Sequence, residues 1–484
     1  MTHAVKFPLV YQLNTRVWLH ELSRKVHRTL TLEGVPDSEF QKWRDLHIDA
    51  LWLMGVWQES NKGRLVAQTH PGLQHAYKHA LPDFTDDDVV SSPYSIADYH
   101  VSDSLGGNAA LQRFRQRLWD AGIKLILDFV PNHVALDHAW LQTHPEFFIA
   151  ATDGAYHASP ESFYEHSNQR FACGRDPYFP AWTDTLQLNY ANPALHDAMI
   201  ATLKTIATLC DGVRCDMSML VLPEVFNRTW AHLGVVMTSD FWGKAIEQVK
   251  HSFPAFLFIA EAYWDTEWTL QQRGFDFIYD KRLYDRIAMR DVAGVKAHLA
   301  GGDLAFQQKL MRFTENHDEE RAREKFGDNH KAAALLSLCA LGARLIHEGQ
   351  LEGWRVKLPV QLIRRPEEPT DADTARFYHK LIRVLQNSAV TCGDFRLLHN
   401  EGDQRIIAFE RASGGKTGHI FLCCNLTEST AESFFFTDAF ESVESYEHLD
   451  IVSTEQFRSP QIEIWQSGVT VRLRPHEGIV CVLR

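Results

Sequence analysis

Acidic side chains follow several apolar runs of the sequence, at positions where they could act together on one substrate. Asp216 ends the run DGVRCD, Glu261 ends AFLFIAE and Asp318 ends KLMRFTENHD. A single acid after an apolar run is most often a helix cap or a loop residue. Three such acids, with Arg214 two positions before the first, instead favour chemistry by paired carboxyl groups. Two carboxyl groups that flank one bond are the usual machinery of glycoside hydrolysis.

The surroundings of the three acids predict different roles for them. Arg214 and Asp216 are two positions apart on a strand and project to the same face, so the arginine should keep the aspartate ionised, as a nucleophile requires. Glu261 ends an apolar run, where desolvation raises a carboxyl pKa and favours a proton donor. Asp318 is then free to hydrogen-bond sugar hydroxyls as positive charge develops on the ring.

These residues need a scaffold that brings the ends of several strands together. Short apolar runs alternate with amphipathic segments such as 108–122, which predicts parallel βαβ units. Eight candidate strands make a (β/α)8 barrel the expected fold, and the chemistry of such a barrel lies at the carboxyl ends of its strands. The expected strands are 10–19, 48–57, 123–130, 211–216, 255–261, 275–280, 309–318 and 342–348.

Two parts of the sequence depart from this alternation. Residues 134–187 are rich in aromatic, Pro, Gly and Asp residues and are too long for a plain loop, which predicts an inserted subdomain after strand three. The barrel then comprises 1–133 and 188–395. From 396 to 484, strand-like runs follow one another without helices, which predicts a C-terminal antiparallel β-sandwich domain. These runs are 404–411, 418–426, 441–449, 469–474 and 478–484.

Composition and charge exclude several classes of partner. The net charge of −13 argues against nucleic acid and against an anionic membrane surface, because both favour a basic face. No run reaches the roughly 18 to 20 apolar residues of a membrane span, and the first residues lack the pattern of a secretory leader. Eight scattered cysteines without a CxxC pair are typical of buried free thiols. We therefore expect a cytoplasmic protein.

Four segments of the chain resemble, in order, the motifs of the α-amylase family of glycoside hydrolases. This resemblance implies a retaining (β/α)8 enzyme acting on α-glucosides. The order and spacing of the motifs agree over roughly residues 10 to 350, and the β-rich tail is similar to the family's C-terminal domain. The four segments are DFVPNH (128–133), GVRCD (212–216), IAEAYW (259–264) and FTENHD (313–318). Two further segments, SPYSIADY (92–99) and LQLNY (186–190), are similar to weaker motifs of the family.

The resemblance assigns a role to each acid. Asp216 is the nucleophile, Glu261 the acid/base and Asp318 the stabiliser of the transition state, while Arg214 orients Asp216. The substrate is then an α-glucan or an oligosaccharide derived from one. The other residues that the resemblance places at the substrate are His133, His317, Tyr94 and Asn316.

Aromatic residues are the next candidates for contacts with sugar rings. Tyr94 corresponds to the residue on which the cleaved sugar stacks in the family. The alternative is that Tyr94 is an ordinary core residue. Trp57, Trp264 and Trp354 are candidates for an extended sugar-binding groove, but tryptophans are more often buried in cores.

The chain departs from the family after the nucleophile. Many members carry a Lys-His pair where this chain has Met219 and Leu220. These apolar side chains either pack into the barrel rim or line an apolar acceptor subsite. The carbonyl of that histidine is also a calcium ligand in many α-amylases, and Asn132 occupies the other familiar ligand position. A backbone carbonyl survives substitution, so calcium is not excluded; we expect it to matter little.

Three functions share these residues. The first is hydrolysis of α-glucosidic bonds. The second is transfer of the glycosyl group to another sugar or to phosphate, as a transglycosylase or a sugar phosphorylase, since only the acceptor differs. The third is carbohydrate binding without catalysis, which the presence of all three acids does not favour.

Overall fold

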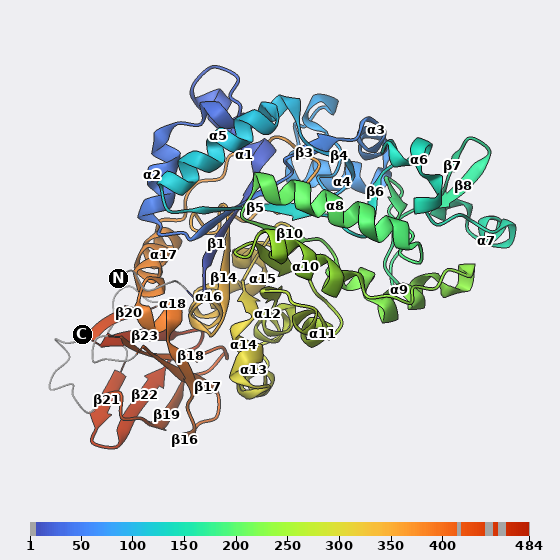
Figure 1. Ribbon diagram of the computed structural model, residues 1–484. Helices are drawn as coiled ribbons and strands as arrows, with labels where there is room; N and C mark the ends of the chain where they lie inside the picture. The colour runs from blue at the N-terminus through green and yellow to red at the C-terminus, as the bar shows by residue number, and fades with distance from the viewer. Residues whose placement is uncertain (1–5, 414–417, 441–448, 454–460, 484) are drawn as a thin grey trace.

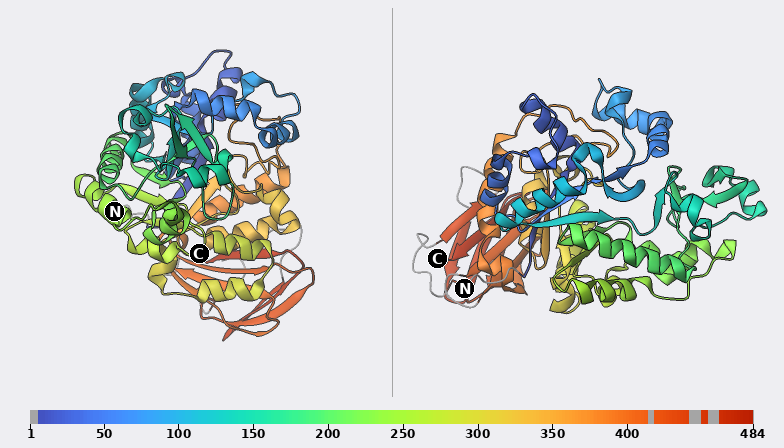
Figure 2. Two further views of the ribbon diagram at one scale, coloured as in Figure 1. Left: turned by 90° about the vertical axis from the view of Figure 1, so that its right-hand side faces the viewer. Right: turned by 45° about the horizontal axis from the view of Figure 1, so that its top comes forward.

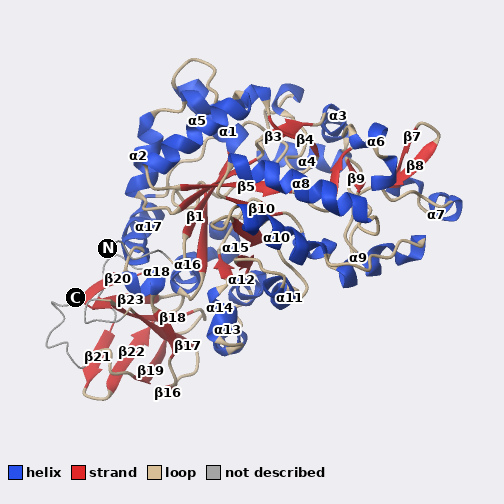
Figure 3. Cartoon of the chain, viewed as in Figure 1, coloured by secondary structure: helices blue, strands red, loops and turns tan. Residues whose placement is uncertain are grey.

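The centre of the molecule is a closed barrel of eight parallel strands surrounded by helices (Figure 1, Figure 3). The computed structural model describes residues 6–413, 418–440, 449–453 and 461–483. The barrel order is β1-β14-β13-β12-β11-β10-β5-β2, which closes back on β1. The strands are β1 (Leu9–Asn14), β2 (Ala50–Met54), β5 (Lys124–Phe129), β10 (Gly212–Cys215), β11 (Leu257–Ala260), β12 (Phe277–Tyr279), β13 (Leu310–Arg312) and β14 (Ala343–His347).

Helices form the outer layer of the barrel and return the chain from one strand to the next. Several begin at a capping side chain: Asn192 caps the helix that starts with Pro193, and Asp240 caps the helix that starts with Phe241. The helices around the barrel are α1 (Thr15–Lys25), α2 (Asp37–Asp45), α5 (Gly107–Asp120), α8 (Pro193–Leu209), α9 (Pro223–Trp230), α10 (Phe241–Ser252), α11 (Glu267–Gln272), α12 (Lys281–Ala288), α13 (Val292–Ala300), α14 (Leu304–Gln308), α15 (Ala322–Phe326), α16 (His330–Cys339) and α17 (Ala372–Leu385).

The first and seventh expected strands are too long. The run 10–19 divides into β1 and the start of α1, because the side chain of Asn14 accepts a hydrogen bond from Val17 N and so begins a helix. The run 309–318 contributes only β13, and the polar residues after Arg312 form the loop that follows the strand.

Two excursions leave the barrel on its carboxyl-end side. The first, residues 55–101, was not expected from sequence; it holds β3 (Trp57–Glu59), β4 (Ile96–Val101), α3 (Asn61–Thr69) and α4 (Pro71–Ala80). The second is the inserted subdomain after β5. Its elements are β6 (His133–Ala135), α6 (Trp140–Thr143), α7 (Asp153–Ala158), β7 (Phe163–His166), β8 (Gln169–Ala172) and β9 (Thr185–Gln187).

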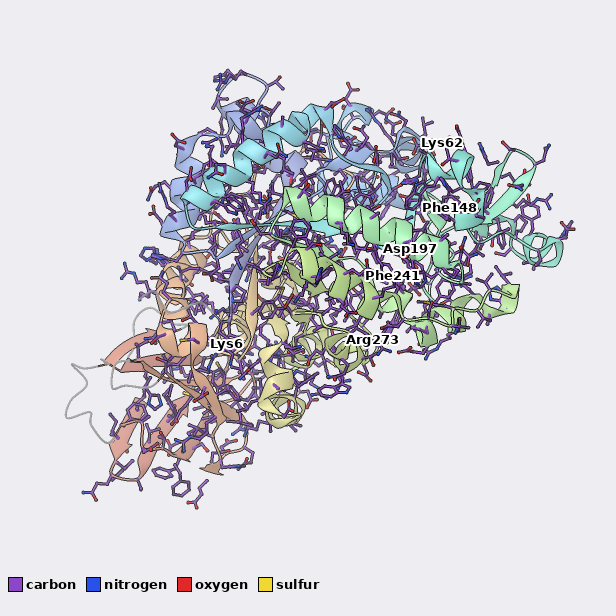
Figure 4. All side chains as sticks on the ribbon, viewed as in Figure 1. Lys6, Lys62, Phe148, Asp197, Phe241 and Arg273 are labelled. Carbon is purple, nitrogen blue, oxygen red and sulfur yellow. The ribbon has the colours of Figure 1, made fainter. Side chains whose placement is uncertain are left out.

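The two excursions touch each other at one end of the molecule. The Nζ atom of Lys62, on α3, donates a hydrogen bond to the hydroxyl of Tyr164 at 2.6 Å. Figure 4 shows Lys62 at this end of the molecule together with Phe148 of the inserted subdomain.

The C-terminal part is a sandwich of two antiparallel sheets, which lies on the side of the barrel away from the inserted subdomain (Figure 2). Its sheets have the orders β15-β17-β18-β23-β20 and β16-β19-β22-β21. The strands are β15 (Asp394–Leu397), β16 (Asn400–Gly402), β17 (Ile406–Ala412), β18 (His419–Asn425), β19 (Ala431–Phe436), β20 (Leu449–Ser453), β21 (Gln461–Trp465), β22 (Gly468–Leu473) and β23 (Gly478–Leu483). The expected run 441–449 lies, except for Leu449, outside the described residues.

Alternation along β18 joins this sandwich to the barrel. Leu422 and Cys424 belong to the core shared with the barrel, whereas Phe421 and Cys423 belong to the core between the two sheets. The fold class expected from sequence is therefore confirmed, while the exact domain boundaries stay a prediction. Among the described residues, no helix combines the length and apolar character needed to cross a bilayer.

Candidate active site

Arg214 lies at the centre of a cluster of four carboxyl groups at the carboxyl end of the barrel. Its Nη1 atom is 2.6 Å from Asp216 Oδ1 and 3.7 Å from Asp128 Oδ1. Its Nη2 atom is 2.8 Å from Glu261 Oε2 and 3.7 Å from Asp318 Oδ2. The arginine is 1% exposed, so these contacts are made away from bulk water. The three acids predicted from the ends of different strands therefore converge on one cation.

Backbone register explains why Arg214 and Asp128 meet. Arg214 of β10 pairs directly with Asp128 of β5, so both side chains leave the sheet at the same level. Asp128 also accepts a hydrogen bond from Trp52 Nε1 at 3.2 Å. Burial raises the pKa of Asp128 to about 7, although the nearby Arg214 favours its ionised form.

Both oxygens of Glu261 are held by hydrogen-bond donors. The backbone N of Met217 donates to Oε2 at 2.6 Å, and the hydroxyl of Tyr263 donates to Oε1 at 3.0 Å. Met217 has φ of +41°, a strained conformation for this residue type, and such strain clusters at functional sites. Burial raises the pKa of Glu261 to about 7, against the opposing effect of Arg214. A carboxyl group with this pKa can donate a proton near neutral pH.

Asp318 differs from Glu261 in its exposure and its partners. Its side chain is 44% exposed, and His317 Nε2 is 3.0 Å from its Oδ2 atom. Burial favours its neutral form, but His317, Arg214 and Lys357 together hold the pKa of this carboxyl well below its usual range. Asp318 and Glu261 thus have pKa values shifted in opposite directions within one site.

His317 is fixed on both ring nitrogens. Gln12 Nε2 lies 2.6 Å from Nδ1, and the hydroxyl of Tyr94 lies 2.5 Å from Nε2. The rings of Tyr94 and His317 are stacked, with centroids 5.3 Å apart. Burial lowers the pKa of His133, which favours a neutral imidazole there.

A cavity of about 300 Å³ opens over this cluster. Five of the residues predicted from sequence line it, namely Asp216, Glu261, Asp318, His133 and Tyr94. Arg214, His317 and Asn316 are not among the lining residues, but Arg214 contacts Asp216 and His317 contacts Tyr94, which both line the cavity. The oxygen of Asn316 accepts hydrogen bonds from Asp318 N at 2.9 Å and Glu319 N at 3.0 Å, so this side chain shapes the turn that carries Asp318.

Several lining residues were missed by sequence reasoning. Tyr263 lies two residues after Glu261, and Met217 directly follows Asp216. Their positions next to predicted acids at strand ends were therefore a signal by which they could have been found. The others come from the excursions and from the segment after β14, where no periodic pattern marks them. They are Ser92, Trp182, Asp184, Thr185 and Gln361.

The apolar residues after the nucleophile position are part of the barrel rim. Met219 is 0% and Leu220 is 2% exposed, and both belong to the main hydrophobic core. The first of the two alternatives, packing into the rim, is therefore the one found.

The candidate groove tryptophans have different surroundings. Trp57 is 2% exposed and donates from Nε1 to Asp128 O at 2.7 Å, so it is a core residue. Trp354 lies against the guanidinium of Arg365. Trp264 packs edge-on against Tyr178 with ring centroids 4.8 Å apart, beside the cavity residue Tyr263.

The surroundings of Asn132 do not fit a calcium ion. The amide nitrogen of Gln187 donates to Asn132 O and Oδ1, both at 3.0 Å, and to Leu188 O at 3.1 Å. It thus occupies a cradle of carbonyl oxygens of the kind that a hard cation would need. Within the described residues, no group of three or more His, Cys, Asp or Glu side chains could hold a metal.

The barrel and the acids at its carboxyl rim define a class of (β/α)8 enzyme site, and comparison with known proteins gives the family. The family model "Alpha amylase, catalytic domain" matches residues 31–371. The chain belongs to the α-amylase family.

Individual relatives are similar over part of their length. α-Amylase MalA of Haloarcula japonica is 28% identical over 274 residues, which are 54% of this chain and 36% of that protein. α-Amylase 3 of Dictyoglomus thermophilum is 24% identical over 358 residues, which are 70% of this chain and 63% of that protein. The chain thus spans between about a third and somewhat under two thirds of the length of these curated relatives.

The match to solved structures extends over nearly the whole of both chains. The crystal structure of an α-amylase from Lactobacillus plantarum has a TM-score of 0.67 and 19% sequence identity, and the match covers 99% of each chain. The debranching enzyme of Nostoc punctiforme has a TM-score of 0.68 and 18% identity. At these identities the similarity establishes a common fold.

Proposed function

We propose that the protein hydrolyses α-glucosidic bonds of α-glucans or maltooligosaccharides with retention of configuration. One observation carries the proposal: Asp216 and Glu261 line one cavity and contact the two terminal nitrogens of the same guanidinium, at 2.6 and 2.8 Å. Shared contact with one small group suits the short carboxyl separation, about 5 to 5.5 Å, of retaining enzymes. The family membership and the α-amylase names of the two curated relatives support α-glucans as the substrate.

In the first step, Glu261 transfers its proton to the glycosidic oxygen while a carboxylate oxygen of Asp216 attacks the anomeric carbon. The bond to the leaving sugar breaks, that sugar departs as an alcohol, and an ester joins the remaining glucosyl unit to Asp216. Arg214 holds Asp216 Oδ1, which leaves Oδ2 for the attack. The charge that develops on the ring is stabilised by Asp318, whose low pKa keeps it ionised.

In the second step, Glu261 acts as a base. It takes a proton from a water molecule, the water oxygen attacks the anomeric carbon, and the bond to Asp216 breaks. The donors Met217 N and Tyr263 OH stabilise the carboxylate form that this step needs. Two inversions at the same carbon give a product with the original α configuration.

Product analysis tests this proposal against its alternatives. We expect early NMR spectra of the reaction to show the α anomer first; a β anomer would rule out retention. Labelled maltooligosaccharides should give shorter sugars. Longer sugars would indicate a transferase that uses the same covalent intermediate, and unchanged sugars would indicate a binding protein.

We also propose a cytoplasmic location. All eight cysteines lie within the described residues as free thiols, and seven of them are buried. Free thiols are typical of a reducing compartment. The net charge of −13 is consistent with a neutral sugar substrate and with the absence of nucleic-acid and membrane partners.

A further inference from the structure

One wall of the catalytic cavity is made by two segments that lie far apart in the sequence. Ser92 belongs to the first excursion, and Gln361 belongs to residues 355–365, which we call the strap. The strap lies between β14 and α17 in the sequence, and it pairs with residues 88–90 of the first excursion.

The strap and the excursion are joined by backbone pairing. Val90 N donates to Gln361 O at 2.9 Å, and Ile363 N donates to Asp88 O at 3.0 Å. Val89 and Leu362 form an antiparallel bridge between these two bonds, and both side chains are completely buried. The two hydrogen bonds flank Leu362, and the first is made by the backbone of Gln361 itself, so the backbone beside the cavity is held to the excursion.

Two arginines fix the end of the strap. Arg364 makes a bidentate contact with Asp88 at 2.9 and 3.0 Å, and its Nη1 atom contacts both oxygens of Asp83. Arg365 contacts Glu348 and Glu21, each at 2.8 Å. Arg364 therefore ties the strap to the excursion, and Arg365 ties it to the end of β14 and to α1. Bidentate pairs of this kind hold a fixed geometry.

The wall stands opposite Glu261. In the closed barrel, β1 lies between β2 and β14, and β11 is the fourth strand from β1 in either direction. The excursion follows β2 and the strap follows β14, so their junction lies over β1. Glu261 comes directly after β11.

We propose that this wall closes the donor side of the cavity, so that the protein removes single glucosyl units from the non-reducing ends of its substrates. The inference rests on the proposed function, in which Glu261 protonates the bond to the leaving sugar. The leaving sugar therefore occupies the Glu261 side. A further sugar on the donor side would have to pass through the opposite side, where Ser92 and Gln361 stand.

The size and chemistry of the cavity agree with this assignment. Its volume of about 300 Å³ is at the low end of ligand pockets, which range over roughly 300 to 1,000 Å³. The wall presents a hydroxyl and a carboxamide, which suit the free hydroxyls of a terminal sugar unit. An internal unit of a glucan has no free hydroxyl at C4, because the next sugar is attached there.

The test uses maltopentaose with a fluorescent label at its reducing end, either free or with an ethylidene group across the C4 and C6 hydroxyls of its non-reducing end. We expect the free substrate to give labelled maltotetraose and glucose as first products. The blocked substrate should react at least 100-fold more slowly. First products of several lengths, or comparable cleavage of the blocked substrate, would overturn the inference and leave the proposed function standing. If neither substrate is shortened, the proposed function itself fails.

Variants of two strap arginines connect the result to the wall. Arg364→Ala removes the contacts to Asp83 and Asp88 and should raise cleavage of the blocked substrate at least tenfold. Arg355→Ala is the matched control, because Arg355 pairs at the surface with Glu324 on α15. It should leave both rates unchanged. An equal effect of the two variants would show that the strap does not form the barrier; if Arg364→Ala does not fold, the wild-type products decide alone.

Discussion

Arg214 sets the charge balance of the site, because each of four carboxyl groups has an oxygen no more than 3.7 Å from one of its two terminal nitrogens. One cation cannot fully compensate four buried or half-buried acids. Burial raises the pKa of both Glu261 and Asp128 to about 7, so each of these two acids is partly protonated near neutral pH.

Loss of either reacting carboxyl group should nearly abolish turnover. We expect Asp216→Asn and Glu261→Gln each to lower kcat about a thousandfold or more, since each removes a group that forms or breaks a bond. Both substitutions keep the side-chain shape, so melting temperatures should stay close to that of the wild type. Initial rates on maltooligosaccharides, with melting curves recorded in parallel, check this. A rate near that of the wild type in either variant would remove that residue from its role.

The pH profile should report the proton on Glu261. Its pKa is raised to about 7, and its protonated form is needed for the first step. We therefore expect kcat/KM to fall by about tenfold per pH unit above pH 7 and to be steady just below it.

Asp128 titrates in the same range, so its variant is the control for this assignment. In Asp128→Asn the overall rate can change, but the alkaline fall should remain. Its disappearance in that variant would assign the fall to Asp128 rather than to Glu261.

At the scale of the elements, a side-chain amide attaches the inserted subdomain to the segment that follows β5. Gln187 of β9 bonds to both oxygens of Asn132, the residue before β6. We therefore expect a chelator to change activity and melting temperature little. Melting curves with EDTA, and with calcium added back, test this expectation. A large drop in melting temperature that calcium alone restores would contradict it.

The elements also explain which parts of the site could be predicted from sequence. Each acid follows an apolar strand, and parallel strands of a barrel end at one rim, so Asp216, Glu261 and Asp318 were predictable. Gln361 and Trp182 come from long connections without periodic patterning, and no local sequence signal shows which residues of such a connection reach the cavity. Asn14 shows a related limit, because a single capping residue ended the first strand inside a run that was expected to form one strand.

At the scale of the whole molecule, Arg411 joins the C-terminal sandwich to the barrel. This buried residue of β17 donates hydrogen bonds to backbone carbonyls only. Two of them, Cys339 and Ala340, lie where α16 leads back to the barrel, Val390 and Gly393 lie between α17 and β15, and Asp394 begins β15. The acceptors are the carbonyl oxygens of Cys339, Ala340, Val390, Gly393 and Asp394.

Removal of this guanidinium should destabilise the molecule strongly. We expect Arg411→Met to lower the free energy of unfolding by at least about 3 kcal/mol, because several buried carbonyls lose their donors. Arg472→Met is the matched control: Arg472 is exposed on β22 and lies 3.9 Å from Glu432. It should cost no more than about 0.5 kcal/mol. Urea unfolding of both variants measures the difference, and equal costs would show that Arg411 does not stabilise the domain contact.

The junction between the strap and the first excursion joins segments that are synthesised at very different times. Asp88 and Arg364 are 276 residues apart in the sequence, and closing a loop of this length costs more entropy than forming a local contact. During synthesis the N-terminal part emerges first. A nascent chain that has been synthesised as far as Asp318 already contains all three acids, yet it lacks residues 355–365, which form the strap. The three acids are therefore synthesised before the strap that, in our proposal, determines the position of cleavage.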